Sequence, residues 1–278
     1  MRFVLPCLMV LLMSASVHAE DTVIRWMLTG VPPKFMTEGP FRGQGYGEQQ
    51  IALLSRRLPQ FGHKMELVTP ARLWHEMQAG PGVCSVDIAE LPERGKWAVF
   101  SRRSTSVPGY RMLVMKERVP EFAEFRGDDG LVDLGRLGAS ERFTGLYVAG
   151  RYYMPEISAF IDNPSRKMRL EAMSASTKIF EMVAGRRGDF SFATVSEMNY
   201  FNALNAAAAP GAKLWPPLAM IGIKGAVALV HGHIACSRDP LGLRAMQAID
   251  HLLDDDHVWA DYLAPEQHWM EDVPLAGR

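Results

Sequence analysis

The sequence predicts an α/β protein, because strand-like and helix-like segments alternate along most of the chain. No repeat or low-complexity linker interrupts that alternation. With 278 residues the chain is long enough for one large or two modest domains with well-covered cores. Its 30 basic and 31 acidic residues are interspersed, so the sequence gives no electrostatic footprint for nucleic acid or an anionic membrane.

The first third of the chain shows the alternation most clearly. Strands are expected at 22–28, 64–68 and 83–89, and helices at 48–58 and 71–79. The helix at 48–58 carries Ile51, Leu54 and Leu58 at helical spacing. The glycine-rich segment before it lacks the third glycine and the acidic partner of a dinucleotide fingerprint, so we interpret it as a turn.

The remaining elements continue the pattern to the end of the chain. Strands are expected at 110–116, 143–148, 190–193 and 226–235, and helices at 155–161, 177–184, 195–203, 241–253 and 257–263.

Residues 1–19 have the features of a cleavable secretory signal peptide. Arg2 is followed by the apolar run 3–17, and Val17-His18-Ala19 forms a small-x-Ala cleavage site before Glu20. The apolar run is shorter than the roughly 20 residues that a membrane-spanning helix needs. We therefore expect an exported protein that begins near Glu20.

Two cysteines remain after the signal peptide, Cys84 and Cys236. A pair of cysteines in an oxidising compartment predicts a disulfide bond. Two buried free thiols are the alternative, because the spacing of cysteines does not fix their connectivity.

The segment 91–101, with the sequence LPERGKWAVFS, places Arg94 just beyond a predicted strand and Phe-Ser a few residues later. It resembles the T-x-E-R…F-S signature of periplasmic solute-binding protein family 3, the amino-acid-binding group in particular. The resemblance implies a two-lobed type 2 periplasmic binding fold, the Venus flytrap, with a hinge. It also implies a discontinuous first lobe at 20–108 and 227–278, and a second lobe at 109–226.

Several ligand-binding residues follow from this resemblance. Arg94 would grip a ligand carboxylate, which a planar guanidinium can do with two parallel hydrogen bonds. Phe35, in a segment similar to the family's Y-P-P-F turn, would cover the ligand. Ala89 stands where the family has a Ser or Thr, and Thr194 stands where it has the Asp that binds the ligand ammonium.

Further candidates lie near the same cleft. Gly150, Arg151 and Tyr152 follow a predicted strand and precede a helix, so they could meet an anion. Alternatively, Arg151 is a solvated residue and the neighbouring tyrosines pack between the lobes. Arg72, at the start of a predicted helix, is a third candidate cation for the cleft.

The missing Asp narrows the expected ligand. A buried ammonium without a carboxylate partner is costly, which argues against an ordinary α-amino acid unless Glu90 or Glu197 compensates. We therefore expect a solute-binding protein for a small carboxylate-bearing ligand. We expect it to act as a periplasmic monomer that serves a transport permease or a sensor protein.

Two alternatives use the same scaffold. One is an enzyme similar to the periplasmic cyclohexadienyl dehydratases, with Glu90 as its acid or base. The other is a ligand-sensing module that acts through another protein. No cofactor is expected, and His231 and His233 lack a third ligand at metal-binding spacing.

Overall fold

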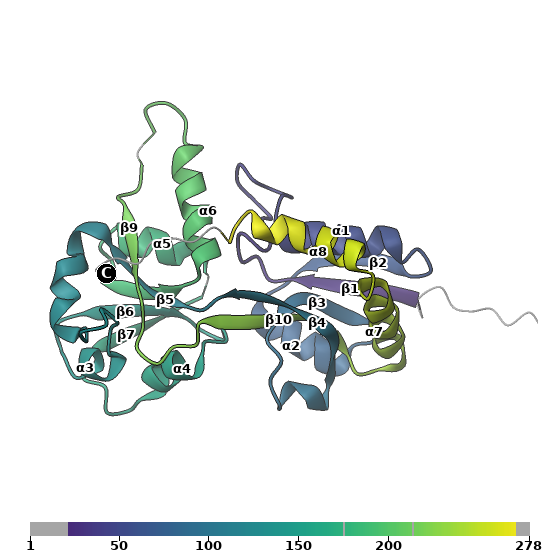
Figure 1. Cartoon of the computed structure of the whole chain (residues 1–278), viewed down its shortest axis with the longest axis horizontal. Helices are drawn as coiled ribbons and strands as arrows, with labels where there is room; N and C mark the ends of the chain where they lie inside the picture. Colours follow the sequence, from purple (N-terminus) through teal and green to yellow (C-terminus); the bar gives the residue numbers. More distant parts are fainter. Residues whose placement is uncertain (1–21, 175, 213, 271–278) are drawn as a thin grey trace, which may run out of the picture.

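We describe a computed structural model of the protein, which covers residues 22–174, 176–212 and 214–270. The predicted signal peptide at 1–19 lies outside these residues. The chain forms two lobes, each built around a five-stranded sheet, and they lie side by side along the long axis of the molecule (Figure 1). No helix in the described part of the chain is long and apolar enough to cross a membrane.

The sheet of the first lobe has the strand order β2-β1-β3-β10-β4. Its strands are β1 (Val23–Leu28), β2 (Gly62–Leu67), β3 (Val83–Ile88), β4 (Ala98–Pro108) and β10 (Leu229–Ser237). β1 pairs in parallel with β2 and β3, whereas β10 runs antiparallel to both β3 and β4. A strand from near the end of the chain therefore occupies the interior of the first sheet.

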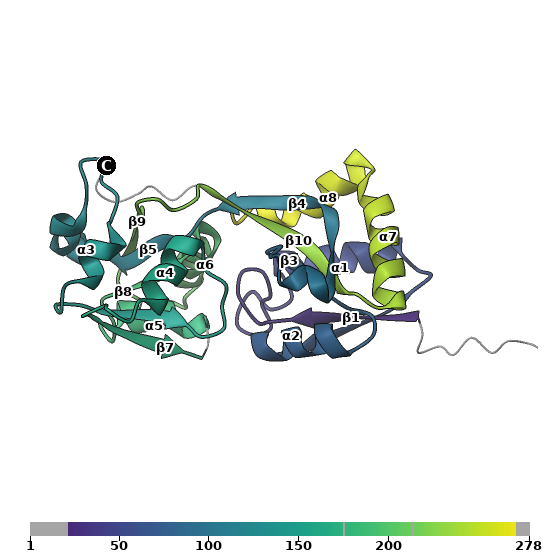
Figure 2. The same cartoon turned by 90° about the horizontal axis from the view of Figure 1, so that it is seen from below.

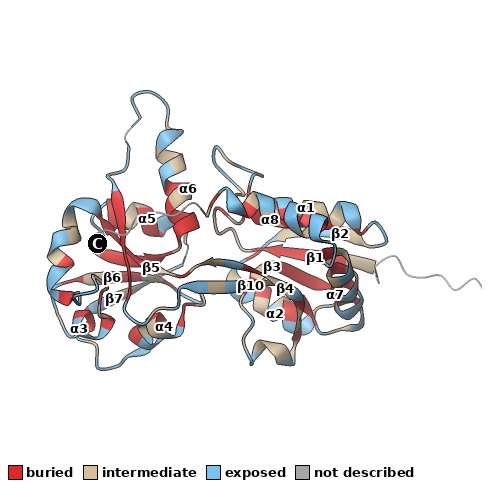
Figure 3. Ribbon diagram, in the orientation of Figure 1, coloured by how far each residue is buried: buried red, intermediate tan, exposed pale blue. Residues whose placement is uncertain are grey.

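Helices cover both faces of this sheet. They are α1 (Tyr46–Arg57), α2 (Pro70–Ala79), α7 (Pro240–Leu253) and α8 (Asp256–Gln267), with the 3₁₀ helix η2 (Arg94–Lys96). Apolar residues of α1, α7 and α8 pack together on one face, and those of α2 pack on the other. The sheet is buried between the two layers (Figure 3).

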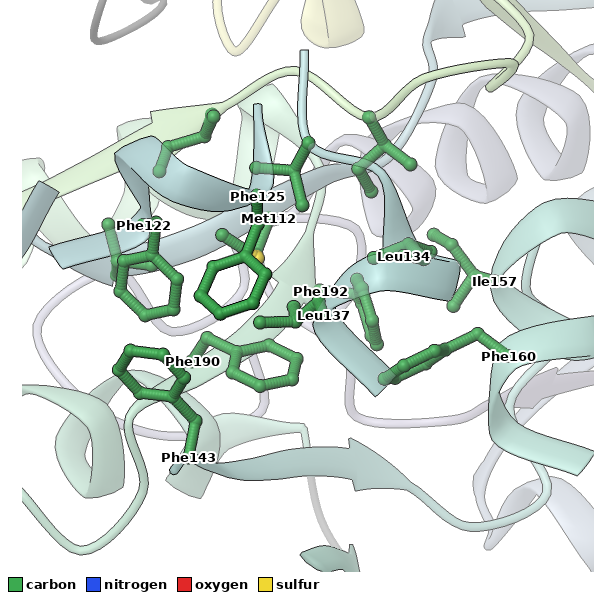
Figure 4. Packing of buried hydrophobic residues seen from close by; sticks show 14 of the residues in the cluster. Met112, Phe122, Phe125, Leu134, Leu137, Phe143, Ile157, Phe160, Phe190 and Phe192 are labelled. Atoms are coloured by element: carbon green, nitrogen blue, oxygen red, sulfur yellow. The ribbon is translucent and has the colours of Figure 1, made fainter. Parts of the chain in front are cut away.

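The sheet of the second lobe has the order β7-β6-β8-β5-β9. Its strands are β5 (Arg111–Met115), β6 (Thr144–Val148), β7 (Arg169–Met173), β8 (Phe190–Ala193) and β9 (Leu218–Ile221). Its helices are η3 (Lys116–Phe125), α3 (Leu134–Gly138), α4 (Pro155–Asp162), α5 (Thr177–Ala184) and α6 (Val195–Ala206). One face of the sheet packs against an aromatic core that includes Phe122, Phe143, Phe190 and Phe192 (Figure 4).

Two neighbouring segments connect the lobes (Figure 2). The chain leaves the first sheet at Pro108 and returns to it at Leu229, and these two residues are paired across β4 and β10. Between them, the Gly109 amide donates to the Ala228 carbonyl at 2.9 Å. A Cβ on residue 109 would lie 2.2 Å from the Val227 carbonyl oxygen, so this crossing requires glycine.

A disulfide bond joins Cys84 and Cys236, as the sequence predicted. The two residues lie directly opposite each other on β3 and β10. Both are fully buried in the core of the first lobe. The bond therefore fastens the late strand to the early one.

The predicted elements all have counterparts in the structure, which also contains six elements that were not predicted: β4, β7, β9, α3, η2 and η3. β4 was not predicted because its middle, Arg102 to Ser106, is polar, and four of those five residues are partly or fully exposed to solvent. The last strand begins at Leu229 rather than at 226, because Gly225 adopts a φ of 78° in the turn before it.

Candidate functional site

A cleft of about 180 Å³ lies between the lobes. The first lobe contributes the segment 29–34, the end of β3, part of α2, and residues of β4 and β10. The second lobe contributes the loop after β6 and the start of α6. Because the carboxyl ends of β3, β6 and β8 all reach this cleft, it occupies the place where open α/β sheets bind ligands.

Arg94 lies in the cleft, half-buried, at the start of η2. Its guanidinium stacks on the Trp74 ring, with Cζ 4.1 Å from the ring centroid. The Tyr152 ring of the second lobe lies on it at 5.7 Å. One donor, Nη1, is satisfied by the Ala89 carbonyl at 2.8 Å.

Within the part of the chain that the structure describes, the charge of Arg94 has no acidic partner. None of the ion pairs formed by the described residues includes it. Burial lowers the pKa of Arg94, and the nearby Glu93 carboxylate only partly opposes that effect. A half-buried cation that contacts two aromatic rings and has no counter-charge among the described residues is suited to binding an anion.

Arg151 has a different role from the one expected. It binds Glu197 through two hydrogen bonds of 2.8 and 2.9 Å, and its Nε donates to the Tyr110 hydroxyl at 2.9 Å. Burial disfavours the Arg151 charge, but Glu197 together with Tyr110 and Tyr153 outweighs this effect and raises the Arg151 pKa well above its ordinary value. The expectation that Arg151 supplies its charge to a ligand is therefore corrected, because Glu197 already neutralises it.

Thr194 helps to hold the same carboxylate. It is the N-cap of α6, and its backbone amide donates to Glu197 Oε2 at 2.9 Å while its hydroxyl donates to the same oxygen at 3.1 Å. This is a capping box, in which the side chain of a residue one turn into the helix accepts a hydrogen bond from the backbone amide of the N-cap residue. The cleft position where the resembled family has an Asp is thus a helix cap beside a neutralised Glu.

A second charged pair faces the cleft from the first lobe. Lys34 Nζ lies 3.5 Å from Asp87 Oδ2 and donates to the Asp87 carbonyl at 3.2 Å. The Tyr46 hydroxyl donates to the same Oδ2 at 2.8 Å. Asp87 has a φ of 54°, which is strained for a residue other than glycine and is typical of functional sites.

Gly232 of β10 makes room for this aspartate, which lies where β3 has one more residue than the facing part of β10. A Cβ on Gly232 would lie 2.1 Å from Asp87 Oδ1, so the carboxylate packs directly on the glycine backbone. The cleft therefore holds two neutralised pairs, Lys34 with Asp87 and Arg151 with Glu197, and the unpaired cation Arg94.

A buried carboxylate lies near the pair formed by Lys34 and Asp87. Glu266 of α8 is 4% exposed, and neither of its carboxylate oxygens has a hydrogen-bond partner among the described residues. Burial and the negative charge of Asp87 raise the pKa of Glu266 to about 8, although Lys34 opposes the shift. This shift favours the protonated form of Glu266 near neutral pH.

The lobes also touch through an aromatic cluster formed by Phe41 and Trp269 of the first lobe and Tyr200 of α6. The three ring centroids are 6.1 to 6.3 Å apart. Asn199 Nδ2 donates to the Trp269 carbonyl at 3.0 Å, and the next residue, Met270, lines the cleft. We call this cluster the aromatic latch.

The structure brings most of the predicted site residues to the cleft and separates three from it. Arg94, Ala89, Gly150, Arg151, Tyr152 and Thr194 line the cleft. Phe35 is fully buried beneath it, Arg72 is an exposed residue paired with Glu76, and Glu90 points away toward His233. Glu90 can therefore be neither the compensating carboxylate nor the cleft acid or base that the sequence suggested.

Other residues that line the cleft were not predicted from the sequence, among them Trp74, Asp87, Tyr46 and Tyr110. Asp87 carried a signal, since an acid inside the buried run VCSVDIA is unusual. The two strand histidines do not meet a third ligand: His231 contacts Ser106, and His233 contacts the Ser101 carbonyl. No group of three potential metal ligands occurs within the described residues.

Comparisons with solved structures identify the fold. A mutant of ArgBP from T. maritima is 15% identical with a TM-score of 0.65, over 91% of this chain and 97% of that one. The solute receptor for L-cysteine of Neisseria gonorrhoeae is 16% identical with a TM-score of 0.62, over 89% and 91%. The ancestral amino acid-binding protein AncCDT-1, a precursor of cyclohexadienyl dehydratase, is 14% identical with a TM-score of 0.61, over 91% and 96%.

The chain therefore has the two-lobed α/β fold of the periplasmic amino-acid-binding proteins, and the fold implied by the sequence resemblance is confirmed. No protein-family model matches the sequence, and no curated protein matches it either.

Proposed function

We propose that the protein is an extracytoplasmic solute-binding protein that captures a small carboxylate-bearing ligand between its lobes. The observation that carries this proposal is Arg94, a half-buried cation in the cleft with no acidic partner among the described residues. Trp74 and Tyr152, on opposite lobes, both contact its guanidinium. A ligand bound to Arg94 would therefore touch both lobes and favour their closure.

The other charges in the cleft argue against a ligand that carries an ammonium group. An ammonium group would need a free carboxylate, but Asp87 is engaged by Lys34 and Tyr46, and Glu197 by Arg151. A ligand with a single negative charge balances the cleft, whereas a zwitterion adds a cation beside Lys34. We infer an anionic solute rather than an ordinary α-amino acid.

The test is ligand-induced thermal stabilisation of the mature protein and of Arg94→Ala, after mass spectrometry of any small molecule that co-purifies. Wild type should be stabilised by monocarboxylates, and Arg94→Ala should lose that response, because truncating one partner of a buried charged pair costs roughly 2–5 kcal/mol of binding. Arg72→Ala, which removes an exposed cation outside the cleft, is the matched control. An equal response of wild type and Arg94→Ala to zwitterionic amino acids would refute the assignment.

The wider setting is part of the same proposal. The lobes would comprise residues 20–108 with 227–278, and 109–226. Export through the signal peptide would place the protein in the periplasm, where a membrane permease or a sensor protein would be its partner.

An enzyme on this scaffold is the second candidate, favoured by the similarity to a precursor of cyclohexadienyl dehydratase and by the strained Asp87. In that case Asp87, hydrogen-bonded to Tyr46 and beside Lys34, would be the acid or base instead of Glu90. Recovery of the bound carboxylate unchanged after prolonged incubation would support binding. Its dehydration by wild type but not by Asp87→Asn would support the enzyme.

A further inference from the structure

A second cavity adjoins the cleft, and we call it the side chamber. It has a volume of about 430 Å³, more than twice that of the cleft. The first lobe contributes the loop from Gly30 to Gly39, and the second lobe contributes α5, α6 and Trp215. The side chamber is thus an interlobe space, like the cleft itself.

The cleft and the side chamber share part of their lining. Pro32, Ser176 and Glu197 line both of them. Glu197 is the charged group at this junction, and Arg151 neutralises it. An uncharged part of a ligand can therefore pass from one space to the other without meeting an uncompensated charge.

The sizes of the two spaces suggest that they act together. Sites for small organic ligands typically enclose roughly 300–1,000 Å³. The cleft alone, at about 180 Å³, falls below this range, and the cleft together with the side chamber falls within it.

The walls of the side chamber are largely apolar and aromatic. Phe180 and Phe201 stack with their centroids 5.2 Å apart, and Leu204 and Trp215 complete this side. Trp215 remains 38% exposed, and its ring has no aromatic partner among the described residues. Of the charged residues at the chamber, Lys178 and Glu181 neutralise each other at 3.3 Å, and Glu38, which forms no ion pair among the described residues, is exposed to solvent.

We propose that the side chamber receives an apolar, preferably aromatic, extension of the ligand whose carboxylate is bound by Arg94. This inference rests on the proposed function and adds the ligand class: a carboxylic acid with an aryl or alkyl tail, rather than a small acid such as propionate. The head is bound by the unpaired cation of the first lobe, and the tail by α5 and α6 of the second.

The experiment compares 3-phenylpropionate with propionate by isothermal titration calorimetry on the mature protein. Burial of the phenyl group should tighten binding about 10- to 100-fold. Leu204→Glu, which places a charge in the chamber wall, and Trp215→Ala, which removes apolar surface, should bring the two affinities close together. Asn202→Ala, an exposed change on the same helix, should leave the difference intact.

The outcomes separate this inference from the proposed function. If the two acids bind with equal affinity and Arg94→Ala binds neither, the side chamber does not bind the ligand tail, and the proposed function is unaffected. The protein could instead bind the neutral 3-phenylpropan-1-ol but neither acid, and Leu204→Glu could abolish that binding. This result would support the apolar site in the side chamber and overturn the proposal that Arg94 binds a carboxylate. Binding of none of the three probes would overturn both.

Discussion

Arg151 and Glu197 join the loop after β6 to the first turn of α6 by two hydrogen bonds of 2.8 and 2.9 Å. Their side chains are only 14% and 6% exposed. The same carboxylate accepts two hydrogen bonds from Thr194. One glutamate thus fixes three parts of the second lobe's cleft wall.

Breaking this pair should therefore destabilise the protein strongly. Glu197→Gln leaves a buried guanidinium without its counter-charge, and such a change typically costs about 3–5 kcal/mol. The double variant Arg151→Met/Glu197→Gln should cost less than the sum of the two single changes. Urea unfolding of all four proteins gives the coupling, and additive losses would mean that the pair does not act as a unit.

The mature protein should contain no free thiol, because Cys84 and Cys236 are bonded. Thiol titration of the native, unreduced protein tests this directly. The loop they close spans 152 positions, and the loop-closure model assigns about 5 kcal/mol to so long a loop. Reduction should therefore lower the urea midpoint markedly, and two titratable thiols in the native protein would contradict the structure.

Glu266 should make stability depend on pH. Its pKa is raised from 4.5 to about 8 on folding, so the folded protein holds a proton that the unfolded chain releases above about pH 4.5. Below about pH 4.5 the contribution of Glu266 to the free energy of unfolding is fully present. As the pH rises from there to about 8, the contribution is lost, by up to roughly 1.4 kcal/mol for each pH unit.

The neutral variant Glu266→Gln tests this pH dependence. It should flatten the decline between pH 5 and about 8, as measured by urea unfolding at each pH. Glu181→Gln, an exposed change, should retain the slope of the wild type. A slope in Glu266→Gln as steep as in wild type would show that another group carries the dependence.

The aromatic latch should restrain opening of the lobes. Aromatic pairs contribute about 0.5–1.5 kcal/mol beyond the area they bury, enough to change a population ratio about twofold to tenfold. Phe41→Ala should therefore increase the radius of gyration of the ligand-free protein in X-ray scattering. Trp215→Ala, which removes an aromatic outside the latch, should leave it unchanged, and an unchanged value in both variants would rule out a restraining role.

Local patterns predicted most of the framework. Strand ends and helix starts could be placed because apolar spacing and Gly or Pro punctuation are local properties. Arg94 was assigned to the cleft because segment 91–101 resembles the signature of a known family. The partners of the cleft residues could not be placed in the same way. Arg151 meets Glu197 46 positions later, and Trp74 reaches Arg94 from another helix. The left-handed backbone of Asp87 leaves no mark in the sequence.

The position of β10 inside the first sheet constrains the order in which the two lobes can fold. All five strands of the second sheet lie between Arg111 and Ile221, so that lobe can complete its hydrogen-bonded ladder as an uninterrupted unit. In the first sheet β4 has no neighbour until Leu229 to Ser237 arrives between it and β3. We therefore expect the first sheet to be completed after the second, because its pairings join segments that lie far apart in the sequence.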